Sequence, residues 1–283
     1  MAHDTLKVVS TAKAHGGMQG VYTTWSDACA CEMTFAVFVP PQALERPCPV
    51  LWYLSGLTCT HQNVMDKGEY RKRAAELGLI IVCPDTSPRG DQVPDDATNW
   101  QFGKGAGFYL DAIEEPWNVN YNMKTHILEE LPALIADNFP ADMSRQSVFG
   151  HSMGGHGALT FALANPDRFK SCSAFAPIVQ PSTADWSKGA FERYLGKDQT
   201  AWRGHDAVAM IEDGATFPEL LVDQGTADGF LEDGLRPWLL EKACKSAGIP
   251  LTLRMQEGYD HSYYFISTFM DDHLDWHAER LKA

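Results

Sequence analysis

The amino-acid sequence predicts an α/β fold, namely the α/β-hydrolase fold, with a mostly parallel central sheet and helices on both faces. Short β-branched or aromatic segments alternate with longer segments of helical periodicity along the 283 residues. The strand-like segments are continuously apolar, which is typical of strands buried on both sides. A composition with 45% hydrophobic and 21% charged residues is sufficient for a large core. Because no repeat or low-complexity linker interrupts the chain, we expect a single domain over residues 1–283.

Seven segments are predicted to be strands and five to be helices. The predicted strands are 33–39, 50–54, 79–83, 147–149, 171–175, 220–223 and 251–255. The predicted helices are 70–77, 121–138, 155–164, 229–247 and 262–281. Two further segments, 84–120 and 177–205, are rich in Gly, Pro, Asp and aromatic residues and are predicted to be long loops. Loops of this length in a compact domain often form the walls of a functional site.

The charge of the chain restricts its partners. Lys and Arg number 23 against 37 Asp and Glu, which gives a net charge of −14. Such a field repels phosphate backbones and anionic lipid head groups, so we expect neither a nucleic-acid nor a membrane partner. The first 17 residues lack the apolar core of a signal peptide, and the aliphatic run 79–82 is far shorter than a membrane span. Seven cysteines without a C-x-x-C pair suggest free thiols in a reducing compartment, so we expect a cytoplasmic protein.

The segment SVFGHSMGGHGAL, residues 147–159, carries the clearest chemical signal. It contains the pattern G-x-S-x-G around Ser152, directly after a predicted strand and before a predicted helix. A nucleophilic serine at such a sharp turn projects its hydroxyl above the sheet, and the tightness of the turn requires small residues at Gly150 and Gly154. The helix N-terminus and the amide of Met153 would stabilise an oxyanion beside the serine.

A serine nucleophile needs a base and a group that orients the base. In hydrolases of this topology the acid and then the histidine follow the serine in the chain, each on a loop after a later strand. Asp228 follows the predicted strand 220–223, and His261 follows the predicted strand 251–255. We therefore expect Ser152, Asp228 and His261 to form a catalytic triad.

Other carboxylates and histidines compete for these roles. Asp223 ends its strand and is expected to be buried there or to brace the loop, so Asp228 is favoured as the acid. Asp260 is expected to hydrogen-bond nearby backbone. His151 and His156 flank the serine but precede the acid, which is the wrong order for the base, and are expected to pack around the turn.

His273 and His277 lie four residues apart on one helix face and could form a metal pair. No H-E-x-x-H pattern is present, so a solvated helix face is favoured and no metal site is expected.

The second oxyanion donor should come from the loop after an early strand. The strand 50–54 precedes such a loop, in which Gly56 allows the backbone to approach a substrate and the amide of Leu57 is the candidate donor. Cys59 lies two residues further on and is interpreted as a thiol in the wall of the site, since it has no His or Asn partner motif of its own.

Six segments together resemble the S-formylglutathione hydrolase family, also called the esterase D family. They are LSGLTCT (54–60), PDTSPRG (84–90), GAGFYLDA (105–112), GHSMGGHGAL (150–159), DQGTADGFL (223–231) and QEGYDHSYYFI (256–266). The resemblance extends from about Gly16 to the C-terminus. It implies a cytosolic, cofactor-free α/β-hydrolase, often a homodimer. Such an enzyme would hydrolyse S-formylglutathione to glutathione and formate in formaldehyde detoxification, with side activity on short-chain esters.

Carried over position by position, the resemblance implies the same triad, with the amides of Leu57 and Met153 at the oxyanion hole. It also implies that Cys59 and Trp186 lie near the acyl pocket. Arg89 and Lys104, in the first long loop, are candidates for contacts with the anionic glutathione moiety. The alternatives are a general short-acyl carboxylesterase or acyltransferase with the same triad, and a hydrolase-fold binding module without chemistry.

Overall fold

The nine strands of the protein form one twisted sheet in the computed structural model, which describes residues 6–282. The order across the sheet is β1-β2-β3-β5-β4-β6-β7-β8-β9. Strands β1, β2, β3 and β5 pair antiparallel, whereas the remaining pairs from β5 to β9 are all parallel. In chain order the strands are β1 (Lys7–Ala14), β2 (Gly17–Ser26), β3 (Cys31–Val39), β4 (Cys48–Leu54), β5 (Ile80–Pro84), β6 (Ala141–His151), β7 (Phe169–Phe175), β8 (Leu220–Gly225) and β9 (Leu251–Gln256). The predicted fold class is confirmed.

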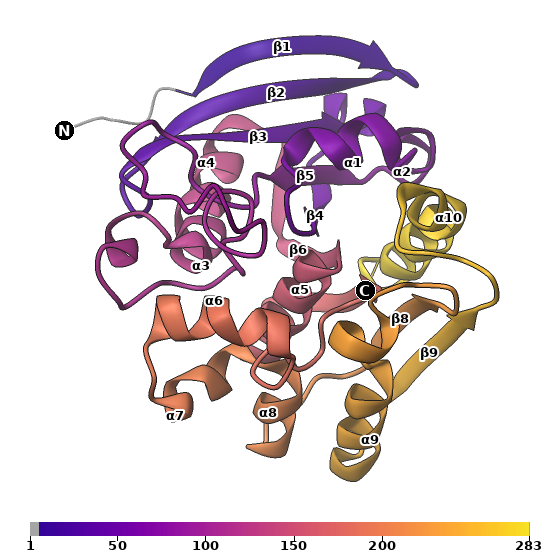
Figure 1. Ribbon diagram of the computed structural model, residues 1–283. Helices are drawn as coiled ribbons and strands as arrows, with labels where there is room; N and C mark the ends of the chain where they lie inside the picture. Colours follow the sequence, from indigo (N-terminus) through magenta and orange to yellow (C-terminus); the bar gives the residue numbers. More distant parts are fainter. Residues whose placement is uncertain (1–5, 283) are drawn as a thin grey trace.

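Helices lie on both faces of the sheet (Figure 1). Successive side chains of a strand point to opposite faces of the sheet, so a buried strand such as β7 contacts helices on both faces. Ser171 and Ser173 hydrogen-bond to His277 on α10, whereas Cys172 donates to a carbonyl of α5. The α-helices are α1 (His61–Lys67), α2 (Arg71–Leu77), α3 (Met123–Thr125), α4 (Leu131–Asn138), α5 (Met153–Ala164), α6 (Asp185–Leu195), α7 (Gln199–Trp202), α8 (Ala207–Glu212), α9 (Pro237–Ala247) and α10 (Tyr263–Arg280).

Short helical turns of other types occur between these elements. The 3₁₀ turns are η1 (Pro41–Leu44), η2 (Trp117–Val119) and η4 (Arg203–His205), and the π-helical turns are η3 (His126–Glu130) and η5 (Leu231–Leu235). They divide two of the predicted helices: residues 121–138 contain α3, η3 and α4, and residues 229–247 contain η5 and α9. The second division falls at Arg236, whose φ of 49° is incompatible with a continuous helix.

The prediction of two long loops is only half correct. Residues 84–120 contain regular structure only at the end of β5 and at η2, as expected. Residues 177–205 instead contain α6 and α7. The buried residues of α6 include Ser187, Ala190, Phe191 and Tyr194, a spacing of three and four that places them on one helix face. Tertiary packing of this face outweighs the low helix propensity of the glycine in its middle.

All seven cysteines are free, and Cys59 is the one that is not fully buried. In residues 6–282 no helix combines the length and the apolar character that crossing a membrane requires.

Candidate active site

Ser152 occupies the sharp turn between the end of β6 and the start of α5. Its φ of 58° and ψ of −118° lie outside the regions that non-glycine residues favour. The turn is held by hydrogen bonds on both sides, because the Ser152 N–H donates to the Phe175 carbonyl at 2.9 Å and the Ser152 carbonyl accepts from the His156 N–H at 2.9 Å. Backbone strain that neighbouring hydrogen bonds hold in place is common at catalytic residues.

The flanking glycines are required by close backbone contacts. A Cβ atom on Gly154 would collide with the carbonyl of Leu54 at the end of β4, and one on Gly150 would collide with the carbonyl of Gly154. Gly56 is similar, since a Cβ there would lie 3.1 Å from Cβ of Ser152. The absence of side chains at these positions brings the loop after β4 directly against the serine.

Asp228 and His261 meet above the ends of β8 and β9. His261 Nδ1 lies 2.6 Å from Asp228 Oδ2, and the Asp228 carboxylate also accepts from the Phe230 N–H at 2.8 Å and from Gln224 Nε2 at 3.2 Å. Asp228 is buried, whereas the His261 side chain is 20% exposed. A buried carboxylate bonded to Nδ1 fixes the orientation of the ring and leaves Nε2 available for proton transfer.

A cavity of about 220 Å³ joins most of the predicted site residues. Its walls include Ser152, His261, Leu57, Cys59 and Trp186. Ser152 and His261 make no direct hydrogen bond within the described chain, a common situation in free enzymes whose catalytic bonds tighten when substrate binds. Asp228 lies behind His261, on its Nδ1 side.

Met153 is the first residue of α5 and is fully buried. Its N–H therefore has no acceptor within the helix and is available beside Ser152.

The loop that carries Leu57 is fastened to the rest of the fold. The Thr58 N–H donates to the Gly105 carbonyl at 2.8 Å, and Arg89 donates to the Cys59 carbonyl at 2.9 Å. Arg89 also contacts the buried carboxylate of Asp85 at 3.0 Å. Arg89 thus holds the loop that faces Ser152.

Lys104 is the other cation that the sequence suggested for the substrate. Its backbone N–H donates to Asp95 Oδ1 at 2.9 Å, and the following residue, Gly105, contacts Thr58 of the Leu57 loop. Lys104 is therefore next to the loop, but it is not among the residues that line the cavity.

Sequence reasoning missed two aromatic residues at the mouth of the cavity, Trp100 and Phe230. Trp100 is 51% exposed and Phe230 is 41% exposed. The ring of Trp100 stacks on Trp186 with centroids 6.5 Å apart, and the edge of Phe230 meets the His261 ring at 5.0 Å. Both residues lie in long or irregular segments that contain no recognisable motif. Exposed aromatic side chains in such segments nevertheless often mark binding surfaces.

Cys59 is half-buried in the cavity wall. Burial raises the pKa of its thiol above the ordinary value, and nearby Tyr263 and Lys67 only partly offset this effect. A thiol with a raised pKa is a poor nucleophile at neutral pH, which agrees with its interpretation as a wall residue.

The competing acids have structural partners. Asp223 is fully buried and accepts from Arg254 Nη2 at 2.6 Å, and it also contacts His273. Burial opposes its ionisation, but His273 and Arg254 outweigh this and lower the pKa of Asp223. Asp260 accepts from the Ser262 N–H at 3.0 Å, as expected for a residue that bonds nearby backbone.

The expectation of a solvated face around His273 and His277 is wrong, because both side chains are completely buried against β7. His273 Nδ1 and His277 Nε2 bond the hydroxyl of Ser173 at 2.8 and 2.7 Å. Serines on a central strand offer the partners that allow neutral histidines to face the core. Among residues 6–282 no cluster of His, Cys, Asp and Glu has the arrangement of a metal site.

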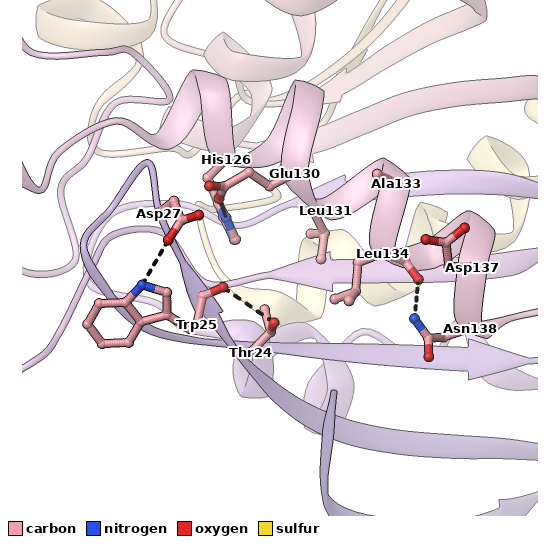
Figure 2. A pocket seen from close by; sticks show the side chains of 10 residues that line it. All are labelled: Thr24, Trp25, Asp27, His126, Glu130, Leu131, Ala133, Leu134, Asp137 and Asn138. Carbon is pink, nitrogen blue, oxygen red and sulfur yellow. Dashed lines mark hydrogen bonds and ion pairs between the residues drawn. The ribbon is translucent and has the colours of Figure 1, made fainter. Parts of the chain in front are cut away.

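A second cavity, of about 410 Å³, lies between β2 and the segment η3–α4 (Figure 2). Trp25 and Asp27 line one side, and His126 and Glu130 project from the helical side. Burial opposes ionisation of Glu130, but hydrogen bonds from His126, Ser26 and Ala28 lower its pKa to about 2. These polar groups are thus engaged in structural contacts, and the cavity shares no residue with the one at Ser152.

Comparison with known proteins identifies the class. A family model for esterases (Esterase) matches residues 26–276. A fluorophosphonate-binding serine hydrolase of Staphylococcus aureus has a similar fold, with a TM-score of 0.73 at 18% identity over 93% of this chain and 98% of its own. The fold and the family match define an esterase of the α/β-hydrolase class.

More similar proteins define the family within this class. The S-formylglutathione hydrolases of Bos taurus and of Paracoccus denitrificans (strain Pd 1222) are each 50% identical, over 98% and 99% of this chain and 99% of their own lengths. The solved S-formylglutathione hydrolase of Agrobacterium tumefaciens is 69% identical over 97% of this chain and 99% of its own, with a TM-score of 0.96. The chain belongs to the S-formylglutathione hydrolase family.

Proposed function

We propose that this protein hydrolyses S-formylglutathione to glutathione and formate, with weaker activity on short-chain carboxylesters. The observation that carries the proposal is the identity of 50% or more with S-formylglutathione hydrolases over nearly the whole chain. The site supports it, because an acid–histidine pair and a serine meet at one small cavity.

In the proposed mechanism Ser152 is the nucleophile, His261 the general base and Asp228 the group that orients it. His261 takes the Ser152 hydroxyl proton while the oxygen attacks the formyl carbon, and the tetrahedral intermediate collapses with cleavage of the carbon–sulfur bond. The proton passes from His261 to the departing thiolate, which gives glutathione. Water, deprotonated by His261, then attacks the formyl carbon of the Ser152 ester. His261 returns that proton to the Ser152 oxygen as formic acid leaves and ionises to formate.

The amides of Leu57 and Met153 are proposed to bind the oxyanion. The two approach Ser152 from different elements, Leu57 from the loop after β4 and Met153 from the start of α5. Each donor of this type contributes about 3–4 kcal/mol of transition-state stabilisation. A thiolate is a good leaving group, so catalysis depends more on this stabilisation than on protonation of sulfur.

Cys59 and Trp186, which line the cavity of about 220 Å³, are proposed to border the acyl group. The leaving thiol must pass His261, which protonates it. Phe230 contacts the His261 ring, and the ring centroids of Trp100 and Phe230 lie 6.5 Å apart. The exposed faces of Trp100 and Phe230 are therefore proposed to contact the glutathione moiety outside the cavity.

The cellular compartment and the oligomeric state of the enzyme are also part of the proposal. Seven free thiols fit the reducing cytoplasm, where glutathione is kept reduced. Association into a homodimer is also proposed, and the edge strand β1, with Val8 and Val9 exposed, is a candidate surface for it.

A substrate panel tests the proposed function. We expect kcat/KM for S-formylglutathione to exceed that for S-acetylglutathione and for p-nitrophenyl acetate by at least about a hundredfold, a difference of roughly 3 kcal/mol in transition-state binding. Equal values for all three would indicate a general short-acyl esterase. Faster transfer of the acyl group to an added alcohol or thiol than to water would indicate an acyltransferase.

A further inference from the structure

His151 immediately precedes Ser152, and the mechanism above does not use its side chain. The residue is 6% exposed, and within residues 6–282 neither Nδ1 nor Nε2 has a hydrogen-bond partner. Buried polar atoms without a partner are uncommon, because they lose their contacts with water and gain nothing in return. An apolar side chain at this position would avoid that penalty, so the histidine requires an explanation other than folding.

The His151 ring lies between the Leu57 loop and the catalytic base. Its centroid is 4.3 Å from that of the His261 ring, with the two planes tilted by 45°. On another side it touches Gly56, where a Cβ would lie 3.2 Å from His151 Nδ1. His151 also lines the catalytic cavity itself. The ring is therefore in direct contact with the side chain that is proposed to gain and lose a proton during the reaction.

His151 remains neutral throughout this cycle. Burial lowers the pKa of His151 well below the ordinary value for histidine, and the neighbouring charge of His261 lowers it further. A neutral imidazole presents polar nitrogen atoms and a ring dipole to its neighbour without adding a second positive charge. A leucine in the same place would present hydrocarbon to a newly formed imidazolium, which is unfavourable in a cavity poor in water.

We propose that His151 is a positioning residue that supports the positively charged form of His261 in the transition state. This rests on the proposed role of His261 as the base. The other titratable groups around this pair of rings are Asp228, which holds His261 Nδ1, Asp260, which precedes His261, Cys59 across the cavity, and Tyr263, whose ring centroid lies 6.3 Å from that of His151. Asp228 is placed to stabilise the imidazolium from its edge, and His151 contacts the same ring from the side of Ser152 and Gly56.

The test uses two variants of similar size. H151L removes the polar nitrogen atoms, and H151Q keeps a neutral polar group. For H151L we expect kcat to fall about tenfold or more with KM nearly unchanged, and the midpoint of the pH–rate profile to move to lower pH. We also expect H151L to melt at a higher temperature than the wild type, since two buried unpaired atoms are removed. H151Q should retain kcat within about threefold and keep the wild-type midpoint.

His156 provides the matched control, because it is a second buried histidine beside the same turn. Its Nε2 bonds the Phe108 carbonyl at 3.1 Å, and its ring packs against Phe108 and Phe191 rather than against His261. H156L should therefore melt at a lower temperature and keep the wild-type midpoint of the pH–rate profile.

Each variant is assayed with S-formylglutathione and with p-nitrophenyl acetate, since His261 acts on both. If the wild type rejects S-formylglutathione, the proposed function fails and the ester still reports on His151. Wild-type kcat and midpoint in H151L, or a loss of kcat accompanied by a lower melting temperature, would overturn the proposal.

Discussion

Cys59 illustrates how the position of a residue and its reactivity can diverge. Its side chain borders the cavity at Ser152, so an adduct on sulfur would obstruct the substrate. Its raised pKa, caused mainly by burial, leaves little thiolate at neutral pH. The thiol is thus well placed for inhibition, and we expect it to react slowly near neutral pH.

We therefore expect iodoacetamide or oxidised glutathione to inactivate the enzyme slowly near pH 7 and faster as pH rises. Cys59→Ala should be active and largely resistant, because the other six cysteines are buried. The measurement is the inactivation rate of both proteins at several pH values. Equal inactivation rates for the two proteins would show that Cys59 does not border the substrate.

Trp100, at the mouth of the cavity, is proposed to contact the glutathione leaving group. Trp100→Ala should raise KM for S-formylglutathione about tenfold and leave KM for p-nitrophenyl acetate unchanged, since one lost aromatic contact is worth about 1 kcal/mol or slightly more. Trp238→Ala is the matched control, because Trp238 on α9 is 40% exposed and lies outside the cavity. A similar change for both substrates would place Trp100 at the acyl group instead.

The site residues that could be predicted from the sequence are those whose neighbours in the chain form a recognisable pattern. Ser152 is flanked by glycines that the turn needs, and Asp228 and His261 each follow a strand in the order that the topology requires. Trp100 and Phe230 have no such pattern. They meet only because residues 84–120 and the segment after β8 fold over the same cavity.

At the scale of elements, α10 connects His261, the proposed base, to the core. The helix begins two residues after His261, and its buried face carries His273 and His277. His277 bonds the hydroxyls of Ser171 and Ser173 at 2.7 Å, and His273 contacts the ionised Asp223 at 3.3 Å. This chain of polar contacts ties α10 to β7 and β8.

These buried histidines predict a pH-dependent stability. Burial lowers the pKa of His277 and, despite Asp223, that of His273, and it lowers the pKa of His156 to about 4. In the unfolded chain histidine titrates near 6.5. The unfolded state therefore binds more protons as pH falls below about 6.5, and the stabilisation that is complete above this pH is progressively lost.

We expect the free energy of unfolding to be constant between about pH 7 and 8 and to fall by about 2 kcal/mol at pH 5 for each histidine that is still neutral in the folded state at that pH. Urea titrations at four pH values measure this. A free energy of unfolding that is unchanged from pH 8 to pH 5 would contradict the assignment of these rings as buried and neutral.

The parallel part of the sheet could be predicted from the sequence, whereas β1 and β2 at its antiparallel end were missed. The seven predicted strands correspond to β3 to β9, although β6 begins six residues before the predicted start and β9 alternates apolar and polar residues. Strand β1 is exposed along nearly its whole length, so its sequence has no buried face to reveal it. The histidines of α10 were assigned to solvent because nothing in the helix itself indicates the serines on β7 that receive them.

At the scale of the whole molecule, the net charge of −14 acts on a substrate that is itself anionic. Repulsion between the two lowers the local concentration of substrate, and salt screens it within about 8 Å at physiological ionic strength. We expect KM for S-formylglutathione to fall by about twofold or more between 10 and 200 mM salt, while KM for an uncharged ester stays constant. Parallel changes for both substrates would exclude this explanation.

The central claim is that Ser152 carries the formyl group from glutathione to water. The most direct measurement is the turnover of S-formylglutathione by Ser152→Ala beside the wild type, with circular dichroism to confirm that both are folded. We expect residual activity below about a thousandth of the wild-type value, because only positioning and oxyanion binding remain. A folded Ser152→Ala protein that keeps more activity than this would contradict the claim and require a different nucleophile.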